Sequence, residues 1–204
     1  MAIGIEDRTR LIALLTRESL RTGTFTLASG RTSHYYVDGR KVTLSAEGAA
    51  VIASCILDIL ASNHPEVQAV GGLTMGADPI VGATLGLAPS RGRGDLRGFL
   101  VRKEAKGHGT GRLIEGPLEA GQVVAILDDV ATTGGSSLLA VEAVEAMGAK
   151  VACVIVVLDR LEGASEAFAD KGLTFHALTT IRDLGVEPLQ PMHPEVTELP
   201  EILG

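Results

Sequence analysis

Two unbroken runs of apolar residues dominate the pattern of this chain. One covers residues 123–127 and the other covers residues 151–158. A strand with one wet face would alternate apolar and polar positions, so both runs predict central strands of a parallel sheet, buried on both faces. Shorter strands are expected at residues 67–70, 99–101 and 173–178, the last at the edge of the sheet.

Helical patterns lie between these strands. Residues 7–20 space their apolar side chains as an amphipathic helix, which Gly23 is expected to end. Ser45 precedes a second helical stretch and is expected to cap it. A third helix should follow residue 137 and end at Gly148. Since strands and helices alternate, the sequence predicts an α/β fold with a mostly parallel sheet and helices on both faces.

The end of the first apolar run carries the clearest chemistry. Asp128 and Asp129 come directly after it, followed by a turn of hydroxyls and glycines: Thr132, Thr133, Gly134, Gly135, Ser136 and Ser137. Such a turn at a helix N-terminus forms a cradle for a phosphate, and neighbouring carboxylates accept hydrogen bonds from a diol. A phosphate beside a diol is a ribose 5-phosphate. The lysine of a nucleoside triphosphate loop is absent. The alternative is an ordinary strand-to-helix turn without a ligand.

A basic segment follows the strand at residues 99–101. Three fixed positive charges and a histidine fall within seven residues of an acidic chain: Arg102, Lys103, Lys106 and His108. Three glycines at alternate positions accompany them, at residues 107, 109 and 111. This composition is typical of a lid that closes on a polyanion and neutralises a leaving group. A solvated basic loop is the alternative.

Arg160 follows the second apolar run, at the sheet edge where α/β proteins bind ligands. Its planar guanidinium suits a carboxylate or the edge of a uracil-like ring. The alternative is a surface ion pair with Asp159 or Glu162.

Two further segments leave their roles open. Residues 24–38 alternate around Ser29 and Gly30 like a hairpin and hold Phe25, Tyr35 and Tyr36 of an aromatic-poor chain. They either cover a flat ligand or form a small satellite core. The glycine-rich turn at residues 71–79 either wraps a second phosphate with backbone N–H groups or binds nothing.

Composition narrows the function classes. The chain has 204 residues, enough for one domain, and a net charge of −7, which argues against nucleic-acid binding. We expect no membrane span and no secretion signal, hence a cytoplasmic protein. Cys55 and Cys153 should be buried reduced thiols that make no metal site. His64, His176 and His193 are expected to be isolated, either structural or solvated.

These motifs resemble those of a known family. The segment from Asp128 to Ser137 resembles the phosphoribosyl-diphosphate signature of type I phosphoribosyltransferases. The basic segment closely resembles the catalytic loop of orotate phosphoribosyltransferases, and Asp159-Arg160-Leu161-Glu162-Gly163 resembles their orotate-binding motif. The resemblance implies a single Rossmann-like domain over residues 1–204. A small N-terminal hood would take about residues 1–44 plus parts of the C-terminus, and the core about residues 45–180.

The resemblance also implies an activity. Ribose 5-phosphate would pass from 5-phosphoribosyl 1-diphosphate to orotate, giving orotidine 5′-monophosphate and diphosphate in pyrimidine biosynthesis. Mg²⁺ would be the cofactor, held mainly by the substrate without direct protein ligands. A homodimer is expected, in which the loop at residues 102–112 reaches the neighbouring active site. No nucleic acid or membrane partner is implied.

Residue roles follow from the same resemblance. The catalytic residues would be Lys103, Lys106, His108, Asp128 and Asp129. The sugar donor would also contact Arg102, Val130, Ala131, Thr132, Thr133, Gly134, Gly135 and Ser136. Orotate would contact Thr132 and Arg160. Two alternatives remain: a type I phosphoribosyltransferase for a purine or uracil, and a non-catalytic nucleotide-sensing regulator of the same fold.

Overall fold

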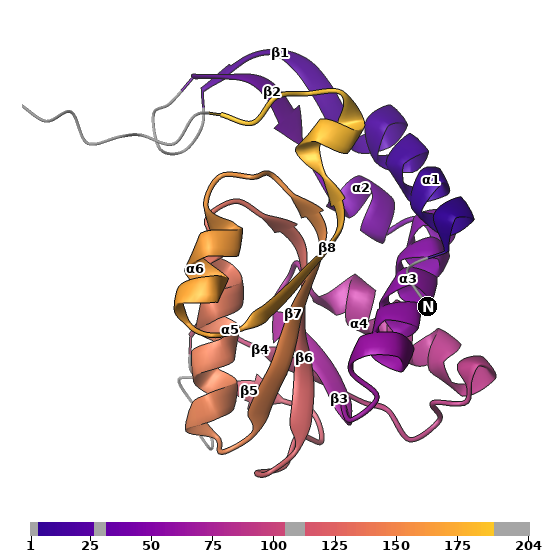
Figure 1. Cartoon of the computed structure of the whole chain (residues 1–204), viewed down its shortest axis with the longest axis vertical. Helices are drawn as coiled ribbons and strands as arrows, with labels where there is room; N and C mark the ends of the chain where they lie inside the picture. The colour runs from indigo at the N-terminus through magenta and orange to yellow at the C-terminus, as the bar shows by residue number, and fades with distance from the viewer. Residues whose placement is uncertain (1–3, 27–31, 105–112, 190–204) are drawn as a thin grey trace, which may run out of the picture.

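A six-stranded sheet forms the middle layer of the computed structural model, which describes residues 4–26, 32–104 and 113–189 (Figure 1). Its strands are β3 (Ala69–Leu73), β4 (Arg97–Val101), β5 (Ile114–Glu115), β6 (Val123–Ala131), β7 (Lys150–Asp159) and β8 (Thr174–Thr180). Their spatial order is β5-β4-β3-β6-β7-β8. Every neighbouring pair is parallel except β4 with β5. The predicted mostly parallel sheet and the edge position of its last strand are confirmed.

Helices cover both faces of this sheet (Figure 1). One side carries α1 (Ile5–Leu14), α3 (Ala46–Asn63), α4 (Asp78–Leu87) and the 3₁₀ turn η2 (Ala88–Arg91). The other side carries α5 (Gly135–Ala146) and α6 (Ala164–Asp170). A short helix α2 (Arg40–Thr43) precedes α3, and a 3₁₀ turn η3 (Ile181–Leu184) follows β8. The side chain of Ser45 accepts a hydrogen bond from the N–H of Gly48, so it caps α3 as predicted.

The central strands are buried on both faces, as their apolar runs predicted. Ala125 and Leu127 of β6 belong to the core beneath α3, whereas Val124 and Ile126 belong to the core beneath α5. Alternate side chains of a strand point to opposite faces, so one apolar run supplies two cores.

The strands are longer than their apolar runs. Asp128 and Asp129 lie inside β6, not after it, because Val130 and Ala131 still pair with β7. Likewise β3 continues through Gly71 and Gly72, which the sequence assigned to a turn. A Cβ at Gly71 would lie 2.4 Å from the carbonyl oxygen of Phe99, so only glycine fits this close approach. The predicted connector at residues 113–122 contains β5.

An antiparallel hairpin stands apart from the main sheet, formed by β1 (Leu20–Thr26) and β2 (Thr32–Val37). The hairpin was predicted, although its turn lies outside the described residues. The predicted end of the first helix at Gly23 is wrong. After α1 the chain forms a π-helical turn, η1 (Leu15–Ser19), and Leu20 already pairs with Val37. This pairing ends the helix before the glycine, which lies within β1.

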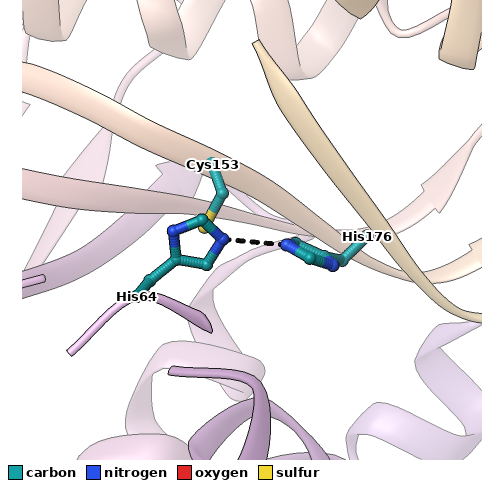
Figure 2. A group of neighbouring side chains, drawn as sticks. All are labelled: His64, Cys153 and His176. Atoms are coloured by element: carbon teal, nitrogen blue, oxygen red, sulfur yellow. Dashed lines mark hydrogen bonds between the residues drawn. The ribbon is translucent and has the colours of Figure 1, made fainter. Parts of the chain in front are cut away.

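Two histidines expected to be isolated lie together. The Nε2 atoms of His64 and His176 are 2.9 Å apart, and the side chain of Cys153 lies beside them (Figure 2). The sequence could not show this, because 112 residues separate the two histidines along the chain. Both cysteines are buried and free, as expected. His193 lies outside the described residues.

Among the described residues, α3 is long and apolar enough to cross a membrane by length and composition alone. Just over half of it, 56%, is buried inside the fold, and a core helix passes the same test. This is weak evidence for a membrane span.

Candidate active site

Two adjoining clefts lie at the carboxyl ends of the strands. The first, of about 300 Å³, lies between the segment after β2, the loop after β3 and the end of β6. The second, of about 270 Å³, lies over the turn between β6 and α5. Asp128, Val130 and Ser136 line both clefts. An extended ligand can therefore occupy both at once.

Asp128 is held from behind by the protein. Its side chain is buried and accepts a hydrogen bond of 2.8 Å from the hydroxyl of Ser137 and one of 3.0 Å from the N–H of Asp129. Burial raises its pKa to about 6, which the hydrogen bond from Ser137 opposes. Ser137 is itself buried. Its hydroxyl hydrogen is donated to the acid, so Ser137 positions Asp128, although it also lines the second cleft with the other predicted cradle residues.

Asp129 faces the first cleft and is half-buried. One of its carboxylate oxygens accepts a hydrogen bond of 2.9 Å from the N–H of Val130. Within the described part of the chain, neither Asp128 nor Asp129 forms an ion pair. The pair thus has carboxylate oxygens left for donors from a ligand or for a cation.

Two glycines, Gly39 and Gly76, pack so closely around the two acids that a side chain at either position would collide with its neighbours. A Cβ at Gly76 would lie 2.7 Å from an oxygen of Asp128 and 2.8 Å from one of Asp129. A Cβ at Gly39 would lie 2.9 Å from the Val130 side chain and 3.3 Å from an oxygen of Asp129. The sequence did not single out Gly39. Neither glycine has an unusual φ, so only the tertiary contact reveals why a side chain is excluded.

The turn after β6 has the shape of an anion cradle. Gly134 adopts a left-handed φ of 79°, and α5 begins at Gly135 with no side-chain cap. The N–H groups of its first turn are therefore available to a ligand. Thr132, Thr133 and Ser136 line the second cleft beside them. The structure thus brings the predicted cradle residues together around one cleft.

Arg160 lines neither cleft. Its Nη2 lies 2.9 Å from Glu162, and its guanidinium lies 5.1 Å from the ring centroid of Tyr35. The hydroxyl of Tyr35 donates a hydrogen bond of 3.0 Å to the same carboxylate. The predicted alternative, a pair with Glu162, is present but buried instead of on the surface. The Nε of Arg160 is buried and has no hydrogen-bond partner.

The basic segment is only partly described. Lys103 lines the first cleft. Arg102, predicted beside it, forms an exposed ion pair of 2.9 Å with Glu115 and lines neither cleft. Lys106 and His108 lie outside the described residues.

The hood aromatics divide between the two predicted roles. Tyr35 is buried and belongs to the core. Tyr36 is exposed, lines the first cleft and lies 5.9 Å from Phe25 between ring centroids. Tyr36 is therefore the aromatic side chain placed to meet a flat ligand. In the glycine-rich turn after β3, Met75 is exposed and also lines this cleft.

No family model matches the chain. Two known proteins match it over most of its length. The orotate phosphoribosyltransferase of Rhodopirellula baltica is 51% identical over 186 residues, covering 89% of this chain and 96% of that protein. The orotate phosphoribosyltransferase of Thermosynechococcus vestitus is 48% identical over 178 residues, covering 87% of this chain and 92% of that protein.

Solved structures agree with these relatives. The Mycobacterium tuberculosis orotate phosphoribosyltransferase in complex with 5-phospho-alpha-D-ribosyl 1-diphosphate is 38% identical, with a TM-score of 0.74 over 88% of this chain and 99% of that one. The Leishmania tarentolae adenine phosphoribosyltransferase is 19% identical, with a TM-score of 0.62 over 88% of this chain and 91% of that one. This second likeness is one of fold alone.

Proposed function

The chain belongs to the orotate phosphoribosyltransferase family, and on this premise we propose how its residues transfer ribose 5-phosphate from 5-phosphoribosyl 1-diphosphate to orotate. The products are orotidine 5′-monophosphate and diphosphate. One observation carries the proposal: two carboxylates without an ion-pair partner among the described residues adjoin an uncapped helix N-terminus.

The sugar donor spans both clefts. Its 5-phosphate occupies the cradle over the start of α5, where hydroxyls and backbone N–H groups donate hydrogen bonds: Thr132, Thr133, Gly134, Gly135 and Ser136. Its 2- and 3-hydroxyls donate to Asp128 and Asp129. Val130 and Ala131, which separate the acids from the cradle along the chain, set the distance between the two parts of the ligand.

The reaction breaks the bond between C1 of ribose and the diphosphate oxygen and forms a bond from C1 to a ring nitrogen of orotate. Positive charge builds on the ribose ring as the diphosphate leaves, as in glycoside cleavage. Asp128 and Asp129 lie close to that charge and stabilise it. Orotate is itself the nucleophile, so no side-chain nucleophile is needed. Its charge at neutral pH lies on the carboxylate, and the proton of the attacking ring nitrogen passes to the departing diphosphate or to solvent as the new bond forms.

The basic segment stabilises the leaving diphosphate. Lys103 lines the first cleft and supplies one positive charge directly. Lys106, His108 and Arg102 complete the charge when the loop closes over the ligand, with Arg102 released from Glu115.

The donor set of the first cleft fits Mg²⁺. Asp128 and Asp129 supply hard oxygen atoms with no competing ion pair among the described residues, and Mg²⁺ prefers such ligands while keeping much of its shell from substrate and water. When bound, Mg²⁺ would neutralise part of the diphosphate charge. The main role of Asp128 and Asp129 is then to bind the ribose hydroxyls, and the substrate supplies most of the metal ligands.

Orotate is held by Arg160 and the Thr132 region. The Nε of Arg160 is a buried donor without a partner, and because Arg160 lines neither cleft, an oxygen of orotate would reach it only after the side chains around the guanidinium move aside. Tyr35 and Glu162 orient the guanidinium for this contact. Tyr36 supplies the ring beside the base.

We propose further that the protein acts as a cytoplasmic homodimer in pyrimidine biosynthesis, with the loop at residues 102–112 reaching the partner's cleft. The family resemblance of that loop supports the dimer. The net charge of −7 supports small-molecule substrates over nucleic acid.

A direct assay tests the activity. Orotate absorbance should fall when purified protein, phosphoribosyl diphosphate and Mg²⁺ are combined, and a panel with adenine, hypoxanthine and uracil should show no comparable turnover. Turnover of a purine or uracil instead would favour another type I enzyme, and no turnover of any base would favour a regulator. Asp128→Ala with Asp129→Ala should abolish turnover while circular dichroism stays unchanged.

A further inference from the structure

A second cluster of reactive side chains lies away from the clefts, toward the amino ends of the strands. His64 follows the C-terminus of α3, Cys153 lies in the first half of β7, and His176 lies in the first half of β8. Figure 2 shows the three side chains converging from these three elements. His64 and Cys153 are buried, and His176 is half-buried.

The spacing of this cluster is close to that of a metal site. One ligand atom from each residue lies within 4.8 Å of the other two. In a tetrahedral zinc site, bonds of about 2.0–2.3 Å place the ligand atoms roughly 3.3–3.8 Å apart. The two Nε2 atoms, at 2.9 Å, would need to separate by only about 0.4 Å to meet that range. The other ligand atoms, which lie within 4.8 Å of one another, would need to approach by up to about 1 Å.

The contact between the two imidazoles also suits a cation. Each Nε2 offers a lone pair, so a proton must lie between them when no metal is bound. A carboxylate oxygen of Glu66 lies 3.4 Å from Nδ1 of His64. This placement favours the proton on Nδ1 and leaves Nε2 as the ligand atom, which is the usual arrangement around a metal-bound histidine.

We propose that His64, Cys153 and His176 bind one zinc-class divalent cation, with water in the fourth position. Two imidazoles and a thiolate are ligands that favour zinc over magnesium or calcium. On binding, the thiol proton of Cys153 passes to solvent and the ring proton of His176 moves to Nδ1. The ion would join the end of α3 to β7 and β8, away from the two clefts, and would be independent of the proposed transferase chemistry.

Cobalt titration tests this site directly. Full-length, tag-free protein is stripped with a chelator and titrated with Co²⁺. We expect a thiolate-to-cobalt charge-transfer band that saturates at one equivalent and disappears when Zn²⁺ is added. Co²⁺ held by Asp128 and Asp129 would have oxygen ligands and no such band, so the two sites are distinguished.

Variants assign the ligands. Cys153→Ser and His176→Gln should each lose the band, whereas Cys55→Ser, which alters the other buried cysteine, should keep it. If Cys153→Ser does not fold, as circular dichroism would show, the half-buried His176→Gln decides. Zn²⁺ should raise the Tm of the parent and of Cys55→Ser but not of His176→Gln. A missing thiolate band, or a band that survives His176→Gln, would overturn the proposal and leave the histidines as a hydrogen-bonded pair.

Discussion

Asp128 shows what a single residue in this site requires. Its charged form accepts hydrogen bonds from ribose hydroxyls with both oxygens and stabilises positive charge on the ring, yet burial raises its pKa to about 6. The hydroxyl of Ser137 and the N–H of Asp129 partly replace the water that it has lost. The acid itself could be found from the sequence. The hydrogen bond from Ser137 could not be predicted, because Ser136 and Ser137 are the same residue type and only the packing of the fold shows which of them is buried against Asp128.

The pKa of Asp128 predicts a pH-dependent change in stability. Its folded pKa of about 6 lies above the ordinary value of 3.8, so its contribution to stability is fully present below pH 3.8 and is lost as the pH rises through 6. Asp128→Asn removes the charge and keeps an acceptor for Ser137. The variant should gain about 2–3 kcal/mol over the parent between pH 4 and pH 8. Urea unfolding at several pH values measures this, and a pH-independent difference would contradict it.

The close packing of Gly76 against the two acids predicts that a single methyl group at this position weakens substrate binding. Its Cβ would lie within 2.8 Å of a carboxylate oxygen of each acid. Gly76→Ala should therefore push the acids out of position and raise the KM for phosphoribosyl diphosphate at least tenfold, about 1.4 kcal/mol of binding.

Gly82 supplies the matched control, because nothing lies within 4 Å of its Cβ position in α4. Gly82→Ala should leave the KM unchanged and stabilise the helix by roughly 0.5–1 kcal/mol. Equal KM values for both variants would show that the clearance at Gly76 is unimportant.

Among the elements, β6 shows where sequence reasoning stops. The apolar run ends at Leu127, but the strand pairs with β7 as far as Ala131. Hydrophobic pattern reports which side chains are buried, whereas a strand continues as long as its backbone hydrogen bonds do. The consequence is functional: Asp128 and Asp129 stand on a rigid strand in the middle of the sheet, where their positions vary less than they would on a loop.

The loop after β4 predicts a kinetic effect. Lys103 lines the first cleft and would stabilise charge only as the diphosphate leaves. Lys103→Ala should therefore lower kcat by about 10²–10³-fold with little change in the KM for orotate. Lys106→Ala should act in the same direction. Steady-state kinetics measures both.

Lys171, an exposed residue that follows α6, is the control. Lys171→Ala should keep the parental kcat. A Lys103 variant with the parental kcat would exclude the proposed role of the loop.

For the whole molecule, the sequence predicted layers better than long-range contacts. Apolar runs located the central strands and, through the rule for parallel sheets, the edge that carries the ligand site. The contacts that cross between distant segments were missed. Tyr35 and Glu162 are 127 residues apart, and His64 and His176 are 112 apart. Such pairs follow from how helices and hairpin pack on the sheet, which local pattern does not encode.

The proposed dimer predicts complementation between two inactive proteins. One variant carries Asp128→Ala with Asp129→Ala, and the other carries Lys106→Ala with His108→Ala, which leaves Lys103 in place beside its own cleft. If the loop acts in the partner's cleft, a mixed dimer contains one site with both sets of residues intact. Unfolding and refolding the variants together should restore about a quarter of parental activity, given random pairing. No recovery, with mixed dimers verified by mass, would place the loop over its own cleft.

The buried contact of Tyr35 with Arg160 and Glu162 also makes the hairpin a reporter of occupancy. These contacts connect β2 to the residues after β7, so the hairpin can separate from the main sheet only if the Tyr35–Glu162 hydrogen bond and the Arg160–Tyr35 contact break. We expect orotate to bind only when these contacts are formed. Because thermodynamic coupling is reciprocal, the contacts then increase the affinity for orotate, and bound orotate stabilises the packed position of β1 and β2 by the same free energy. Deuterium uptake by the amides of this ribbon should accordingly slow as orotate is added.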